Sequence, residues 1–147
     1  MSFMIVKKKF KLVGMRGYGE YAQFSKDVPE LAKKAVSRAK EMDLTGTEIA
    51  LFEPKKDEQH KSGHYYVGVI VSEKISEVPA GMDYIEFERP YVTTRGDMSN
   101  LGELHMELLN WAKEQGQERD RDSYIVETYH PAADGMEEVE IYLPIKQ

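Results

Sequence analysis

The residue with the clearest chemical potential in this sequence is a glutamate set among bulky, strand-forming residues. Glu127 lies within the segment Tyr124–Tyr129, where it would either face water from an edge strand or form a partly buried carboxylate in a groove. In a groove, a cationic or polar ligand would offset the cost of burying its charge. The aromatic faces for stacking or cation–π contacts with such a ligand would come from Tyr18, Tyr66, Tyr129 and Tyr142.

Other arrangements that could carry catalysis or hold a metal are weak. His60 and His64 are four residues apart, but they fall in an expected loop, so we predict no metal site. His105 and His130 are interpreted as structural residues. The glycines of segment 14–19 do not follow the dinucleotide-binding pattern, no Gly-x-Ser-x-Gly motif is present, and no cofactor is expected. Because the sequence has no cysteine, a cysteine nucleophile, thiolate metal sites and disulfides are excluded.

The chain has the size and composition of one globular domain, which we place at residues 1–147. Its residues are 41% hydrophobic and 31% charged, so neither a disordered tail nor a membrane protein is expected. The apolar run at residues 1–6 ends at Lys7, which is too short for a signal peptide or a membrane span, and we expect a cytoplasmic protein. A net charge of −6 argues against direct binding to nucleic acid, because the phosphates attract a positive field.

Two helical segments indicate an internal duplication. Residues 28–42 align with residues 101–115 at an offset of 73, with five identical positions, and both carry apolar residues at helical spacing. Asp27 and Asn100 are expected to cap the two helices. The residues expected to superpose about a pseudo-twofold axis are Leu31 with Leu104 and Ala39 with Ala112.

Strand-like segments repeat in the same order around these helices. Each half of the chain, about 1–75 and 80–147, has the pattern strand, helix, strand, strand. The sequence therefore predicts an α+β fold made by tandem duplication, with antiparallel sheets, both helices on one side and a ligand groove on the other. The matching strand segments are 13–17 with 92–96, 49–54 with 126–131, and 65–71 with 139–145.

The two halves differ at positions that would shape the groove. Glu127 corresponds to Ala50, so the fold itself does not need a carboxylate there. Tyr142 corresponds to Gly68, which would leave the groove open. The strand face that carries Tyr66 and Gly68 is apolar, so a ligand or a partner must cover it.

The segments 66–69, 78–82, 125–129 and 140–145 resemble those of the GyrI-like small-molecule-binding domain. This is the effector-binding domain of AraC-type and MerR-type multidrug-sensing regulators, and it also occurs as a free-standing protein. The resemblance covers essentially the whole chain and implies two pseudo-symmetric halves around a groove where an acidic residue meets hydrophobic, often cationic ligands. Glu127 takes that acidic position, and Tyr142 takes that of the aromatic residue in the last strand. The segment 28–42 departs from the family because it lacks the tryptophan often found there.

We therefore expect a sensor or sequestering protein that captures amphipathic aromatic or cationic compounds. One alternative is a hydrolase of strained cyclopropane-bearing natural products, with Glu127 as general base and Tyr142 as a proton or hydrogen-bond donor. Another is a protein-interaction module such as a gyrase inhibitor. Trp111 is interpreted as a core residue or as a wall of the groove. The candidate ligand-binding residues are Glu127, Tyr142, Tyr66, Tyr129, Tyr18, Gly68 and Trp111.

Overall fold

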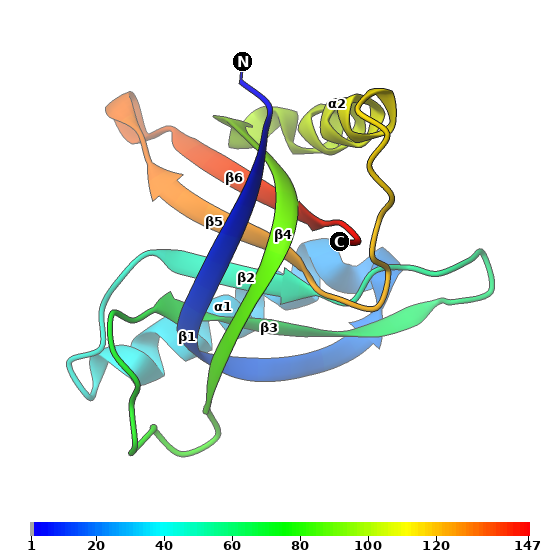
Figure 1. Ribbon diagram of the computed structural model, residues 1–147. Helices are drawn as coiled ribbons and strands as arrows, with labels where there is room; N and C mark the ends of the chain where they lie inside the picture. The colour runs from blue at the N-terminus through cyan, green and yellow to red at the C-terminus, as the bar shows by residue number, and fades with distance from the viewer. Residues whose placement is uncertain (1) are drawn as a thin grey trace.

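The computed structural model describes residues 2–147, which form six strands and two α-helices (Figure 1). Short 3-10 turns precede both helices, at Tyr21–Gln23 and Met98–Asn100. Among residues 2–147, neither helix is long and apolar enough to cross a membrane. The elements in chain order are β1 (Met4–Glu20), α1 (Phe24–Lys40), β2 (Glu48–Phe52), β3 (Ser62–Ile70), β4 (Asp83–Asp97), α2 (Leu101–Glu114), β5 (Ile125–Pro131) and β6 (Glu137–Pro144).

The strands close into a barrel in the order β1-β3-β2-β5-β6-β4, with every neighbouring pair antiparallel. The α+β class predicted from the sequence is confirmed. Exchanging β1 with β4, β2 with β5, and β3 with β6 leaves the strand order unchanged. The two halves therefore have the same connectivity, and they meet at two seams, β1–β4 and β2–β5.

Closure of the barrel buries the apolar face for which the sequence predicted a ligand or partner. Successive residues of a strand point to opposite faces, so every second side chain enters the barrel. The expectation of an open groove on the face opposite the helices is wrong, because the sheet covers that face by curving back on itself. The buried interior of the barrel consists of Phe10, Leu12, Ile49, Leu51, Tyr91, Val126 and Tyr142.

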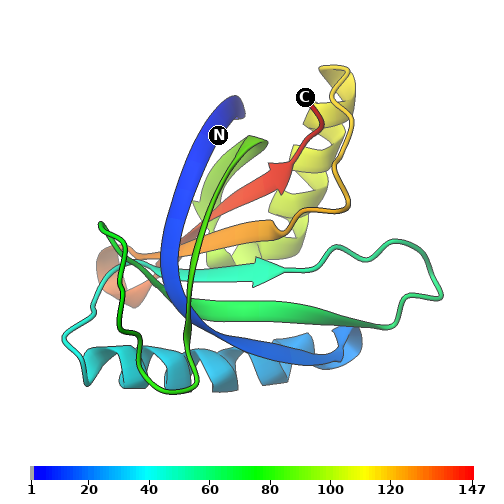
Figure 2. The ribbon, with the colours of Figure 1, turned by 60° about the horizontal axis from the view of Figure 1, so that its bottom comes forward.

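The two helices pack on the outside of the barrel, each against strands of its own half. α1 packs on β1 and β3, and α2 packs on β4 and β6, so the β2–β5 seam runs between them. Figure 2 shows α1 beneath the barrel and α2 rising along one side of it. Small residues allow the close approach of helix and sheet, and Ala39 and Ala112, which correspond in the sequence alignment, are both fully buried.

Helix α1 begins at Phe24, earlier than the sequence indicated, because the turn at Tyr21–Gln23 leads directly into it. The prediction that Asp27 caps this helix is wrong, since Asp27 lies in its first turn. Asn100 does occupy the N-cap position of α2, but its side chain makes no capping bond. The capping interaction belongs to Asp97, whose carboxylate accepts from the Ser99 amide at 2.8 Å.

Gly68 allows β3 to approach β1 closely, and a substitution at this position tests how tightly the two strands pack. A Cβ atom at Gly68 would lie 1.9 Å from the Val13 carbonyl oxygen of β1, whereas a Cβ at Gly102 in α2 would meet nothing within 4 Å. We expect Gly68→Ala to lower the free energy of unfolding by about 2–3 kcal/mol through overpacking. Gly102→Ala should leave it unchanged or slightly higher, because alanine favours helix. Urea unfolding of both variants measures the difference, and equal stability of the two would contradict this account of the β1–β3 packing.

Candidate functional site

A cavity of about 1120 Å³ lies over the β2–β5 seam, between the two helices. Most of its wall is apolar, as expected for a site that binds organic molecules. Helix α1 contributes Phe24, Val28, Ala32 and Val36; the turn before α2 contributes Met98, and the start of α2 contributes Leu101 and His105; and the seam contributes Ala50, Phe52, Ile125, Glu127 and Tyr129.

The floor of this cavity contains the carboxylate of Glu127. Glu127 lies in the middle of β5 and is only 5% exposed. It faces Ala50 across the seam, and both residues line the cavity. A buried carboxylate in an apolar wall is costly unless it is hydrogen-bonded or paired.

Two side chains satisfy the Glu127 carboxylate, one at each oxygen. His105 Nε2 lies 2.7 Å from Oε2, and the Tyr129 hydroxyl donates to Oε1 at 2.7 Å. Both partners belong to the second half of the chain, His105 from α2 and Tyr129 from the same strand. The result is a carboxylate with one hydrogen-bond partner at each oxygen, and each oxygen can still accept a further hydrogen bond.

The surroundings of Tyr129 are negatively charged. Burial raises the pKa of the Tyr129 hydroxyl well above its usual value of 10.0, and the charge and hydrogen bond of Glu127 raise it further. The charges of Glu137 and Glu48 raise the pKa of Tyr129 as well, by less than that of Glu127. The carboxylates of Glu48, Glu127 and Glu137 therefore act as negative charges around Tyr129, while Lys33, Lys40 and Lys55 also line the cavity.

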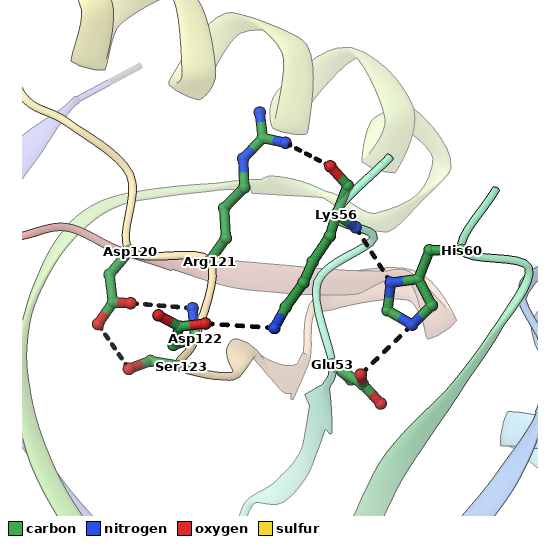
Figure 3. A network of polar contacts seen from close by, with 7 residues as sticks. All are labelled: Glu53, Lys56, His60, Asp120, Arg121, Asp122 and Ser123. Carbon is green, nitrogen blue, oxygen red and sulfur yellow. Dashed lines mark hydrogen bonds and ion pairs between the residues drawn. The ribbon is translucent and has the colours of Figure 1, made fainter. Parts of the chain in front are cut away.

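A polar network fixes the loop at the other end of the cavity (Figure 3). Glu53 lines the cavity, and its carboxylate contacts His60 Nε2 at 3.3 Å and accepts from the His64 amide at 2.9 Å. His60 Nδ1 accepts from the Lys56 amide at 3.1 Å, and Lys56 pairs with Asp122 at 3.2 Å. The loop after β2 is thereby joined to the loop before β5.

The structure separates the predicted site residues into two groups. Glu127, Tyr129 and Gly68 line the cavity. Gly68, however, leaves no open space, because its missing side chain would point into β1. The prediction that Gly68 widens the groove is therefore wrong.

The other predicted residues lie outside the cavity. Tyr142 of β6 pairs with Val126 of β5, and its side chain points into the barrel, where it packs on Phe10. Burial there raises the pKa of Tyr142 to about 12. Tyr66 points the same way and packs on Tyr124. Their expected approach to Glu127 is wrong, because alternate residues of a strand face opposite sides. Tyr18 is 64% exposed. Trp111 of α2 stacks on Phe3 and packs against the core beneath that helix, so it is a packing residue and not a wall of the cavity.

The sequence interpretation missed His105, although the alignment of the halves contained the signal. At the offset of 73, His105 corresponds to Ala32. In the matching strand segments 49–54 and 126–131, Phe52 corresponds to Tyr129 and Ala50 corresponds to Glu127. All six of these residues line the cavity. The three polar groups of the site thus replace two alanines and a phenylalanine of the first half.

Comparison with known proteins agrees with this geometry. The model of the family Cass2, integron-associated effector binding protein, matches residues 4–145. The chain belongs to this family. The resemblance to GyrI-like effector-binding domains is thereby confirmed. Among curated proteins, none matches the sequence.

Solved structures show the same fold at low sequence identity. SAV2435, solved with bound tetraphenylphosphonium, is 15% identical with a TM-score of 0.70, over 99% of this chain and 94% of that one. The Vibrio cholerae integron cassette protein VCH_CASS2 is 17% identical with a TM-score of 0.67, over 98% and 95%. A hydrolase from Listeria innocua is 13% identical with a TM-score of 0.58, over 98% and 91%.

The hydrogen bond from Tyr129 to Glu127 generates a prediction about stability. Tyr129→Phe should lower the free energy of unfolding at neutral pH by roughly 1–3 kcal/mol, because a buried carboxylate oxygen loses its donor. The pKa of Tyr129 is raised in the folded protein, so its contribution is complete below pH 10.0 and is lost as pH rises above that value, where the unfolded chain ionises. The gap between wild type and Tyr129→Phe should therefore narrow above pH 10.0.

Denaturant unfolding at a series of alkaline pH values measures this gap. Tyr18→Phe is the matched control, because Tyr18 is exposed and stands outside the cavity. It should follow the wild type at every pH. A gap between wild type and Tyr129→Phe that stays constant across the alkaline range would show that the hydroxyl is not held in its neutral form by the fold.

Proposed function

We propose that this protein is a cytoplasmic effector-binding protein that captures amphipathic, aromatic cations in the cavity over the β2–β5 seam, as a sensor or a sequestering protein. The observation that carries the proposal is the buried Glu127 carboxylate at the floor of a cavity whose wall is mostly apolar. An apolar wall binds the body of such a ligand through its buried area, and the carboxylate binds its charge. Tyr129 and Phe52 present aromatic groups on the same surface.

The size of the cavity supports a ligand larger than a metabolite fragment. Its volume of about 1120 Å³ is slightly larger than that of most sites that take drug-sized molecules, which run from about 300 to 1,000 Å³. SAV2435 has the same fold and was solved with tetraphenylphosphonium, a bulky aromatic cation. We expect that class of compound to suit this cavity, because several aromatic rings would contact its apolar wall while the positive centre faces Glu127.

The charge of Glu127 can be tested with two ions of one shape. Tetraphenylphosphonium and tetraphenylborate are alike in size but opposite in charge, so their difference in affinity isolates electrostatics from buried area. We expect wild type to prefer the cation strongly. Glu127→Gln keeps the shape and removes the charge, and it should weaken cation binding by roughly ten- to a hundredfold.

Isothermal titration calorimetry of both ions with both proteins gives the four affinities. Glu107→Gln on the exposed surface of α2 is the control, because it makes the same change in net charge outside the cavity. It should bind both ions as wild type does. Equal affinities of wild type and Glu127→Gln for the cation would remove Glu127 from the site and would contradict the proposal.

A hydrolase is the second candidate, favoured by the fixed position of Glu127 between two hydrogen-bond partners. Glu127 would activate water as general base, and Tyr129 or His105, not the barrel residue Tyr142, would assist at the same carboxylate. Incubation with a strained cyclopropane-bearing compound separates the two candidates. A hydrolase would consume the compound, and Glu127→Gln would slow it by about a hundredfold or more. A binder leaves it intact.

A further inference from the structure

A second cavity of about 460 Å³ lies beyond the other end of α2, away from the effector cavity. Its floor is formed by Leu109 and Ala112 of α2. Its sides come from the segment 117–122 and from Lys146, which pair as a short extension of the sheet through the Arg119–Ile145 bridge. None of these residues lines the first cavity.

Arg119 is the unusual residue of this second cavity. Its Nε atom is buried and has no hydrogen-bond partner among residues 2–147. Burial lowers the pKa of Arg119, and the neighbouring Arg121 lowers it further. A guanidinium that is half removed from water and placed beside a second guanidinium destabilises the free protein. Such a placement is expected at a functional site, where a bound anion would supply the missing opposite charge.

The other charges of the cavity leave this positive potential uncompensated. The two carboxylates of the lining are already engaged, Glu118 with Lys146 at 3.1 Å and Asp122 with Lys56 at 3.2 Å. Among residues 2–147, no carboxylate forms an ion pair with the remaining cations of the lining. These are Lys113, Arg119 and Arg121.

Arg121 is held in place without being neutralised. Its Nη1 donates to the Lys56 carbonyl oxygen at 3.1 Å, so the network of Figure 3 orients the guanidinium while its charge remains free. A guanidinium oriented in advance loses less entropy when it binds an oxyanion, and its planar fork matches the geometry of phosphate or carboxylate oxygens.

We propose that the cavity formed by Lys113, Arg119 and Arg121 binds the oxyanion group, phosphate or carboxylate, of a small organic molecule. The cavity is larger than an inorganic ion requires, and Leu109 and Ala112 offer an apolar surface for the rest of the molecule. This site is separate from the proposed effector site and does not depend on it. It also gives this acidic protein a local positive surface.

The experiment uses pyrophosphate and citrate as probes of the two oxyanion chemistries, with sodium chloride at equal ionic strength as the reference. We expect at least one of the two probes to raise the melting temperature of the wild-type protein above its value in chloride. Calorimetric titration then gives the affinity of that probe. Stabilisation by pyrophosphate alone identifies a phosphate site, and stabilisation by citrate alone identifies a carboxylate site.

Two variants test the residues. Arg119→Met keeps the aliphatic stem, and we expect it to weaken binding of the stabilising probe by roughly ten- to a hundredfold while remaining at least as stable as wild type in chloride. Arg121→Gln, on the exposed side of the cavity, should weaken binding as well and carries less risk to folding. Arg38→Gln is the control, because it removes the same charge from α1.

Two results would overturn the proposal. The first is the absence of any stabilisation by pyrophosphate or citrate beyond that of chloride. The second is a probe affinity in Arg119→Met and Arg121→Gln equal to that of Arg38→Gln, which would show that the anion binds by net charge and not in this cavity.

Discussion

A buried carboxylate must be satisfied, and the arrangement of the site follows from how Glu127 meets that requirement. Its two oxygens take one partner each, His105 from α2 and Tyr129 from β5. The contact to His105 joins the first turns of α2 to the β2–β5 seam and so fixes one wall of the cavity against its floor. Helix α1 packs on β1 and β3 and forms the opposite wall without reaching over the seam. The cavity exists because two helices flank a seam that neither covers.

The repeated architecture explains the shape of the cavity, and the differences between the halves explain its chemistry. Each half contributes a helix and a central strand to the same cavity, since equivalent positions converge at the β2–β5 seam. In the first half these positions are apolar, with Ala32, Ala50 and Phe52. In the second half they carry an imidazole, a carboxylate and a phenol. At these three pairs of positions, the first half supplies apolar surface and the second half supplies polar groups.

Much of the fold could be predicted from the sequence, because strand alternation, helical spacing and the matched halves are local patterns. Glu127 was also recognisable, since a carboxylate among strand-formers contrasts with Ala50 at the corresponding place. The sequence did not reveal which side of the sheet carries the site. Barrel closure depends on the pairing of β1 with β4, which is a contact between distant segments, and it directed Tyr66 and Tyr142 into the core. His105 was overlooked because a histidine on a helix carries no distinctive local pattern until the opposing strand is known.

We expect a cationic ligand to approach Glu127 beside Ala50, since both residues line the cavity, and a larger side chain at position 50 tests this most directly. Ala50→Leu places an aliphatic group beside the carboxylate without changing any charge, since cross-strand Cβ atoms lie about 4.5–5.5 Å apart. Calorimetric titration of tetraphenylphosphonium into folded Ala50→Leu protein should show an affinity at least about tenfold weaker than wild type, as expected when a contact of more than about 1.4 kcal/mol is blocked. An affinity equal to that of wild type would place the ligand elsewhere and would contradict the account.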